Sequence, residues 1–290
     1  MKPIPNAVIG GSGLYQLEGM TDVREIEVET PFGPTSDAII VGELAGIGVA
    51  FLPRHGRGHT ISPTELPARA NIWALKSLGV KRILASSACG SLRQELAPRH
   101  IVVPDQLYDR TRHRAPHTFF GGGIVAHVGF ADPFCPALRK TLLDGARAAG
   151  ATVHDGGTMV VMEGPQFSTR AESNTYRQLG FDTIGMTALP EAKLAREAEI
   201  CYASMNLVTD YDVWYAEHDE VTVEMVVANM QANLETAKSI LRYALPAMEA
   251  LDDSCGCGSA LAGAIITDPE RIPQHKKREL RLLIEKYVEV

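Results

Sequence analysis

The stretch Arg82-Ile83-Leu84-Ala85-Ser86-Ser87 is a short apolar run that ends in small hydroxyl residues. Four further runs have the same character, at residues 7–10, 49–53, 158–162 and 205–209, and glycine, proline or polar clusters bound each of them. Runs of this length and composition predict strands that are covered on both faces, as in a largely parallel sheet.

Helical patterns separate these runs. The clearest extends from Val221 to Leu245, has one apolar face, and is expected to stop at Pro246. Shorter patterns cover residues 71–78 and 136–149, follow the capping-box pair Thr169 and Glu172, and begin near Gln274.

Strands that alternate with helices predict an α/β fold, here a single domain with a central mixed, mostly parallel sheet flanked by helices. We expect the α/β domain to occupy residues 1–250. Residues 251–290 are expected to form a loop and a helix that pack on the same body or on a neighbouring subunit.

The composition of the 290 residues is typical of a globular protein, with 45% apolar and 22% charged residues. A net charge of −7 argues against a nucleic-acid surface, which needs clustered Lys and Arg. No run reaches the ~18 apolar residues of a membrane span, and the N-terminus lacks the apolar core of a signal peptide. We therefore expect a cytoplasmic protein with no nucleic-acid or membrane partner.

Five cysteines are too few and too scattered for a secreted disulfide scaffold. Cys255 and Cys257 could supply half of a zinc site, but no second Cys or His pair has a matching spacing. We therefore expect no metal. The sequence leaves open the redox state and the pairing of Cys135, Cys201, Cys255 and Cys257.

Polar loops follow the predicted strands, at the positions where α/β sheets bind ligands. The glycines of Gly10-Gly11-Ser12-Gly13 let backbone N–H groups approach an anion. Arg54 and His55 follow the run at 49–53 and offer donors to a phosphate. Ser86 and Ser87 lead into Cys89, which we interpret as a buried structural thiol.

Thr209-Asp210-Tyr211-Asp212 follows the run at 205–209. Two carboxylates at a spacing of two on an extended chain point the same way, and a like-charged neighbour raises at least one pKa. Such a carboxyl suits a general acid. Residues 162–168 and 185–187 combine apolar bulk with hydroxyl groups, which suits a sugar or base pocket.

Taken in order, these segments resemble the methylthioadenosine phosphorylases of the trimeric purine nucleoside phosphorylase family. The resemblance runs from Ala7 to about Leu245 and rests on six strings: 9–14, 54–57, 70–76, 88–93, 163–165 and 209–212. It implies that 5′-methylthioadenosine and phosphate give adenine and 5-methylthioribose 1-phosphate. Inorganic phosphate would be a co-substrate, and no cofactor is implied.

The resemblance also implies roles for individual residues. The phosphate site would consist of Ser12, Arg54, His55, Ser87, the backbone of Ala88, and Thr187. The ribose and base would contact Phe167, Ser168, Met186, Asp210 and Asp212, with Asp210 as the catalytic acid and Asp212 as its partner. The methylthio pocket would include His59, Val223, Val226 and His127. Because the matching histidine for His127 comes from an adjacent subunit, a homo-oligomer, trimer or hexamer, is implied.

Several alternatives stay open on the sequence. A phosphorylase of broader or 6-oxo purine specificity is disfavoured because relatives with that specificity carry Asn at the position of Asp210. A phosphate-independent nucleosidase would use Arg54 and His55 only to shape a loop. A dehydrogenase is disfavoured because Gln16 interrupts the glycine fingerprint. A nucleoside-binding protein without turnover would bind ligand and release no product.

Overall fold

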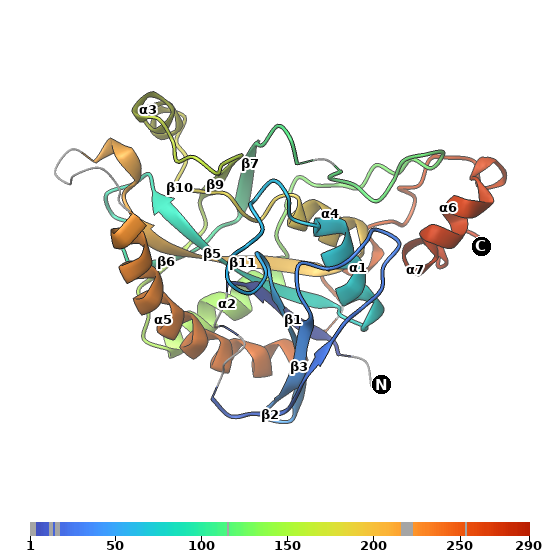
Figure 1. Ribbon diagram of the computed structural model, residues 1–290, viewed down its shortest axis with the longest axis horizontal. Coiled ribbons are helices and arrows are strands. Elements are labelled where there is room, and N and C mark those ends of the chain that lie inside the picture. The colour runs from blue at the N-terminus through green and yellow to red at the C-terminus, as the bar shows by residue number, and fades with distance from the viewer. Residues whose placement is uncertain (1–3, 12–13, 15–17, 115, 216–222, 253) are drawn as a thin grey trace.

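The computed structural model describes residues 4–11, 14, 18–114, 116–215, 223–252 and 254–290. Eleven strands of this part of the chain form one sheet, with helices on both of its faces (Figure 1). The strands are β1 (Asn6–Gly10), β2 (Met20–Ile26), β3 (Ile39–Leu44), β4 (Ile47–Pro53), β5 (Arg82–Ser91), β6 (Ile101–Val103), β7 (Gln106–Arg110), β8 (Val153–Asp155), β9 (Thr158–Met162), β10 (Thr183–Gly185) and β11 (Cys201–Asp210).

The helices of the described residues lie on both faces of the sheet. They are α1 (Ala68–Ser77), α2 (Pro136–Ala148), α3 (Arg170–Gln178), α4 (Glu191–Glu197), α5 (Val223–Glu249), α6 (Gln274–Glu279) and α7 (Arg281–Ile284), with short 3-10 turns at Asp212–Trp214, Cys257–Ser259 and Pro269–Arg271. Helices α2 and α5 pack on each other and share one apolar core with the sheet, whereas α1 and α4 share the other. The predicted α/β class is therefore confirmed.

The predicted mostly parallel sheet is also confirmed. Six strand pairings are parallel and four are antiparallel among the described residues. Strand β1 lies between β4 and β5 and is parallel to both, and β11 is parallel to β5. Because parallel strands end at the same edge of a sheet, the loops that follow β1, β4 and β11 converge there.

Strand β10 adds one more segment to this edge. It runs antiparallel to the end of β5, with Thr183 opposite Ser91 and Ile184 opposite Gly90. The contact between β5 and β10 is close, since a Cβ added at Gly185 would lie 3.4 Å from the carbonyl oxygen of Ala88. The residues after β10 therefore begin beside the end of β5.

The C-terminal segment packs against the body through buried apolar side chains. Leu261, Leu280 and Ile284 belong to the same apolar core as Trp73 of α1 and Phe119. Backbone hydrogen bonds join residues 264–266 to residues 125–127. Figure 1 shows α6 and α7 together at one end of the molecule.

Two predicted helix boundaries are wrong. Helix α5 continues past Pro246 to Glu249, because the missing N–H costs only one hydrogen bond near the helix end, and Leu245 and Met248 are buried in the core. The predicted last helix is divided into α6 and α7 at Leu280, whose backbone leaves the helical region at φ −98° and ψ 7°. The capping box of Thr169 and Glu172 is confirmed.

Candidate active site

A buried ion pair fixes Arg54 at the sheet edge where the loops after β1, β4 and β11 converge. Its Nε and Nη2 donate to the carboxylate of Glu191 at 2.5 and 3.1 Å, and Nη1 donates to the carbonyl of Ser86 at 2.8 Å. Tyr202 also donates to Glu191, at 3.0 Å. Burial opposes the charge of the guanidinium, but the carboxylate of Glu191 outweighs it and raises the pKa of Arg54. The guanidinium is therefore rigidly oriented and largely neutralised by its partner.

His55 is the second buried side chain of this loop. Its Nδ1 lies 2.9 Å from the carbonyl oxygen of Ile61, so Nδ1 carries the proton and Nε2 is an acceptor. Burial and the charge of Arg54 lower the pKa of His55 to about 4, which makes the ring neutral at pH 7. His59, which is exposed, stacks on His55 with 4.3 Å between ring centroids.

Arg57, the second arginine of the loop, does not join this group. Its guanidinium donates to Glu25 and Asp37 at 2.8 to 3.3 Å, and its side chain is 45% exposed. The loop pattern of two arginines and two histidines therefore divides into an inner half, Arg54 and His55, and an outer half.

Two hydroxyl groups meet where β5 approaches the end of β10. The hydroxyl of Thr187 donates to the hydroxyl of Ser87 at 2.6 Å. Ser87 is buried, and Thr187 and Ala88 are half-buried. The structure therefore brings Ser87 and Thr187 together, next to the Ser86 carbonyl that holds Arg54. Ser12 lies outside the described residues.

Asp210 is the last residue of β11 and is buried. Its Oδ2 accepts a hydrogen bond from the hydroxyl of Thr209 at 2.7 Å, and its Oδ1 accepts one from the backbone amide of Asp212 at 2.8 Å. The space beside it on β5 is tight, because a Cβ at Gly90 would lie 3.0 Å from Oδ1 of Asp210 and would require this side chain to shift. Burial raises the pKa of Asp210 against these two hydrogen bonds, which favours the protonated carboxyl.

Asp212 lies beside Asp210, but not for the predicted reason. The chain is not extended between them: Tyr211 has φ −94° and ψ 18°, and Asp212 is left-handed with φ 51°. The tight turn, rather than strand alternation, brings the two carboxyls together. Burial, with a further contribution from Asp210, raises the pKa of Asp212 to about 6. Its Oδ2 is buried and has no hydrogen-bond partner among the described residues.

Arg114 is a central residue that the sequence reasoning missed. Nη1 of its buried side chain donates to the carbonyls of Met186 and Leu189 at 2.5 and 2.9 Å, and Nη2 donates to those of Met162 and Glu163 at 2.9 and 2.7 Å. It therefore joins the ends of β9 and β10. No motif marked it, although an arginine between two histidines was a visible signal.

The remaining predicted residues are more dispersed. Phe167 is 50% exposed, and the hydroxyl of the buried Ser168 lies 3.6 Å from the sulfur of Met162. His127 is exposed, and its backbone amide donates to Ala264 in the C-terminal segment. The side chains of Val223 and Val226 lie outside the described residues.

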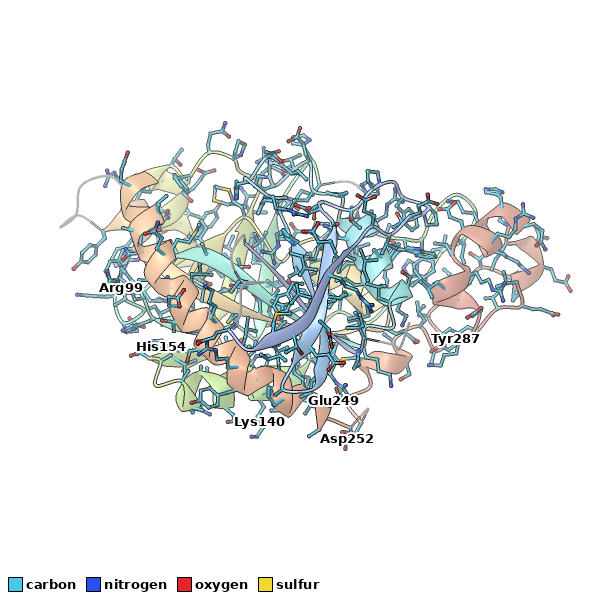
Figure 2. The ribbon with its side chains drawn as sticks, turned by 60° about the horizontal axis from the view of Figure 1, so that its bottom comes forward. Arg99, Lys140, His154, Glu249, Asp252 and Tyr287 are labelled. Carbon is cyan, nitrogen blue, oxygen red and sulfur yellow. The ribbon has the colours of Figure 1, made fainter. Side chains whose placement is uncertain are left out.

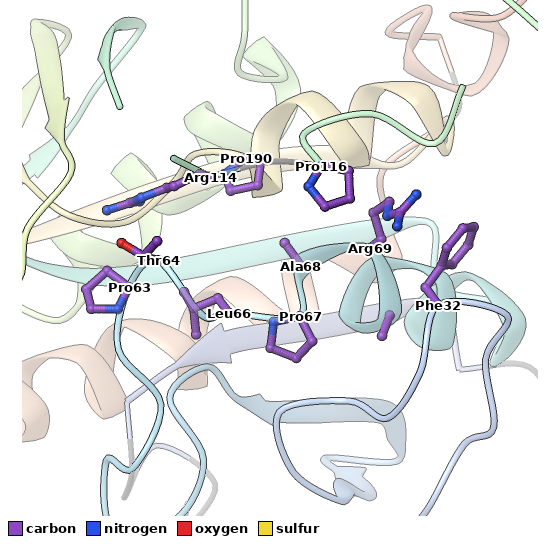
Figure 3. Close-up of a pocket in the computed structure, with 11 residues that line it drawn as sticks. Phe32, Pro63, Thr64, Leu66, Pro67, Ala68, Arg69, Arg114, Pro116 and Pro190 are labelled. Carbon is purple, nitrogen blue, oxygen red and sulfur yellow. The ribbon is translucent and has the colours of Figure 1, made fainter. Parts of the chain in front are cut away.

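A pocket of about 100 Å³ lies beside Arg114 (Figure 3). Arg114 and Thr64 are part of its wall, and the hydroxyl of Thr64 donates to Glu163 at 2.7 Å. None of the residues predicted for substrate binding lines it. Its walls are Phe32, Pro63, Thr64, Leu66, Pro67, Ala68, Arg69, Ala70, Arg114, Pro116 and Pro190.

Two thiols far apart in the sequence join the Cys255-x-Cys257 pair. The sulfur atoms of Cys135, Cys201, Cys255 and Cys257 all lie within 4.8 Å of one another. The sequence shows no second pair, because Cys135 precedes α2 and Cys201 begins β11, 66 residues later. Only the fold brings these two positions together. Cys89, in contrast, is a buried thiol as predicted, and burial raises its pKa.

Known proteins share this architecture and this sequence. A family model described as the phosphorylase superfamily matches residues 5–246. S-methyl-5'-thioadenosine phosphorylases of Geobacter sulfurreducens and Koribacter versatilis are each 56% identical to the chain, over 97% of its length and 98% and 95% of theirs.

Solved structures agree with these relatives. A methylthioadenosine phosphorylase from an antarctic soil metagenomic library has a TM-score of 0.94 and 44% identity, covering 98% of this chain and 100% of its own. The Schistosoma mansoni methylthioadenosine phosphorylase in complex with adenine has a TM-score of 0.85 and 36% identity, covering 91% of this chain and 99% of its own.

None of the helices in the described ranges has the length and apolarity needed to cross a membrane. The chain belongs to the phosphorylase superfamily and, within it, to the S-methyl-5'-thioadenosine phosphorylases.

Proposed function

We propose that this protein converts 5′-methylthioadenosine and inorganic phosphate into adenine and 5-methylthioribose 1-phosphate. The names of its relatives support this reaction over one on 6-oxo purines. The observation that carries the proposal is the placement of the Arg54, Ser87 and Thr187 polar groups and the buried Asp210 carboxyl, whose pKa burial raises, at the same sheet edge. These are the two groups that phosphorolysis needs.

Phosphate binding is assigned to Arg54, His55, Ser87, Thr187 and the backbone of Ala88. Arg54 has five N–H groups. Three donate to Glu191 or to the carbonyl of Ser86, and a fourth, on Nη2, lies 3.5 Å from the carbonyl oxygen of Ile9. One N–H on Nη1 is therefore left for a ligand oxygen. Neutral His55 offers Nε2 as an acceptor. An acceptor at this place suits the P–O–H group of hydrogen phosphate.

Cleavage of the N-glycosidic bond builds positive charge on the ribose, as in other glycosyl transfers. The bound phosphate stabilises this charge and its oxygen attacks C1′. The electrons of the broken bond move into the purine, whose N7 receives a proton or a strong hydrogen bond from Asp210. Burial raises the pKa of Asp210, a shift in the direction that this step needs.

Asp210 also selects the base. Its carboxyl holds N7 and accepts a hydrogen bond from the 6-amino group of adenine, whereas a 6-oxo group would face an acceptor. A site that is built to hydrogen-bond a substrate group can reject analogues by ~10⁴–10⁵. Buried Oδ2 of Asp212 supplies a further acceptor next to it.

The rest of the nucleoside is assigned to residues outside this group. Phe167, Ser168 and the main chain of Met186 contact the base and ribose, and His59, Val223 and Val226 line the methylthio pocket. His127 completes this pocket from a neighbouring subunit, so the active form is a homo-oligomer. A cytoplasmic location, and turnover with phosphate and no cofactor, belong to the same proposal.

Replacing Arg54 tests the phosphate site. Arg54→Lys keeps a positive charge beside Glu191 but loses the fork, so we expect the KM for phosphate to rise at least tenfold while the KM for methylthioadenosine changes little. Arg57→Lys is the matched control, because Arg57 is held outside the site by Glu25 and Asp37. A normal phosphate response in both Arg54→Lys and Ser87→Ala would contradict the assignment.

A further inference from the structure

Four cysteines outside the proposed active site form one compact group. Cys135 precedes α2, Cys201 begins β11, and Cys255 and Cys257 lie in the loop after α5. Their four sulfur atoms lie within 4.8 Å of one another. Cys135 and Cys257 are buried and the other two are half-buried, so the group is partly screened from solvent.

The sulfur positions fit a tetrahedral metal site. With Zn–S bonds of about 2.3 Å, the sulfur atoms of a Cys₄ site are about 3.8 Å apart. In a disulfide the two sulfur atoms are about 2.05 Å apart, whereas the sulfur atoms of Cys201 and Cys255 are 3.3 Å apart. Two disulfides would require short sulfur–sulfur distances only within each bonded pair. Here all four atoms are mutually close.

We propose that Cys135, Cys201, Cys255 and Cys257 bind one Zn²⁺ ion as four thiolates. Four S–H groups lose their protons to solvent and four S–Zn bonds form, with no oxidation or reduction. Zinc is favoured because soft thiolates in a tetrahedral set select it over hard cations. Four protein ligands leave no position for water or substrate, so the ion is structural.

The ion would join the C-terminal segment to the α/β body. Cys201 and Asp210 are at opposite ends of the ten-residue β11, about 30 Å apart by strand geometry, so the metal does not take part in catalysis. The chain runs from Cys257 to Ala264 and Ile266, which hydrogen-bond to the segment that carries His127. Figure 2 shows Lys140 of α2 and Asp252, near Cys255, at the same edge of the molecule.

Metal content is the direct test, and it does not depend on catalytic activity. The untagged protein, purified under reducing conditions without added metal, should contain about one zinc per chain by elemental mass spectrometry. The double variant Cys255→Ser/Cys257→Ser should contain none. Cys89→Ser, which changes a buried thiol outside the group, should keep its zinc.

Native and denatured intact masses separate the alternatives. Zinc binding predicts a native mass increased by one zinc and a denatured mass with all five thiols reduced. Two disulfides would lower the denatured mass by four hydrogens and give no metal, which would overturn the proposal. Reduced protein that binds neither Zn²⁺ nor Co²⁺ on titration would overturn it as well. Tetrahedral Co²⁺–thiolate absorption would support it even where the zinc was lost during purification.

Discussion

At the scale of single residues, burial is the largest influence on the pKa of Asp210. The carboxyl accepts hydrogen bonds from Thr209 and from the amide of Asp212, both of which favour the carboxylate, yet burial raises its pKa. The residue therefore binds a proton more readily than an exposed aspartate, which is the direction that the proposed proton transfer to the departing purine needs.

Asp210→Asn tests this role. The amide is nearly isosteric but cannot supply an acidic proton, so kcat/KM for methylthioadenosine should fall by ~10²–10⁴. The ratio of inosine to methylthioadenosine activity should rise, because the amide can donate to a 6-oxo group. Steady-state assays with both nucleosides measure this. Unchanged cleavage of methylthioadenosine would contradict the role of Asp210.

The raised pKa of Asp212 makes folding stability depend on pH. The folded-state pKa is about 6 and the ordinary value is 3.8, so the folded state binds more protons between these values. The free energy of unfolding therefore falls as pH rises from about 4 to 6, by on the order of 3 kcal/mol. Relative to the wild type, Asp212→Asn should gain stability over this range in denaturant titrations.

Asp144→Asn is the control for this pH effect. Hydrogen bonding to Lys140 lowers the pKa of Asp144, so its contribution to stability is present at neutral pH and is lost as pH falls. The variant should therefore lose stability relative to the wild type at neutral pH and not at acid pH. If Asp212→Asn behaved in the same direction as Asp144→Asn, the raised pKa of Asp212 would be refuted.

At the scale of secondary-structure elements, the site depends on how the ends of β9 and β10 are joined. Arg114 bridges four carbonyls from these two ends with two nitrogen atoms. A lysine is a point donor and cannot span them. Arg114 thus positions Met186 and Glu163 without itself being assigned a contact to the substrate.

Arg114→Lys should lower kcat/KM for methylthioadenosine by about 10²-fold, the scale expected when reacting groups move by about 1 Å. Most of the change should appear in the nucleoside KM, with the phosphate KM less affected. Arg112→Lys is the control, because Arg112 is exposed and contacts Glu163 through its backbone amide. Equal kinetics for the two variants would exclude the positioning role.

The sequence predicts β1, β4, β5, β9 and β11 and misses the other strands of the described residues. Runs such as 82–87 and 205–209 are apolar enough to stand out, and both strands are present and longer than predicted. Strands β6, β8 and β10 have three residues each, too few to show a period, and β2 is almost entirely exposed. Arg114 was missed for a related reason: its partners are backbone carbonyls, which no side-chain motif records.

At the scale of the whole molecule, contacts between distant segments decide what the sequence could not. The four cysteines meet only because the start of α2, the start of β11 and the loop after α5 adjoin. The six strings of the resemblance are each local, and so the family and the sheet edge were predictable. The roles of all the assigned site residues stay predictions, including those of Ser12, Val223, Val226 and His127.

The homo-oligomer can be tested by complementation. His127→Ala and Asp210→Asn should each lower activity, but co-expressed subunits would form some sites with an intact Asp210 and an intact neighbouring His127. Activity should then exceed the mean of the two variants purified separately. The control is co-expression of Ser87→Ala subunits with Asp210→Asn subunits. Each site takes both of these residues from the same subunit, so every site keeps one of the two changes and no such gain is expected. A gain for neither pair would contradict the shared site.

The most direct measurement of the central claim is adenine release from 5′-methylthioadenosine by the purified protein, with and without inorganic phosphate, followed by chromatography. We predict release that requires phosphate, yields one 5-methylthioribose 1-phosphate per adenine, and is much faster than base release from inosine. Equal release in the absence of phosphate would show a hydrolase and contradict the account.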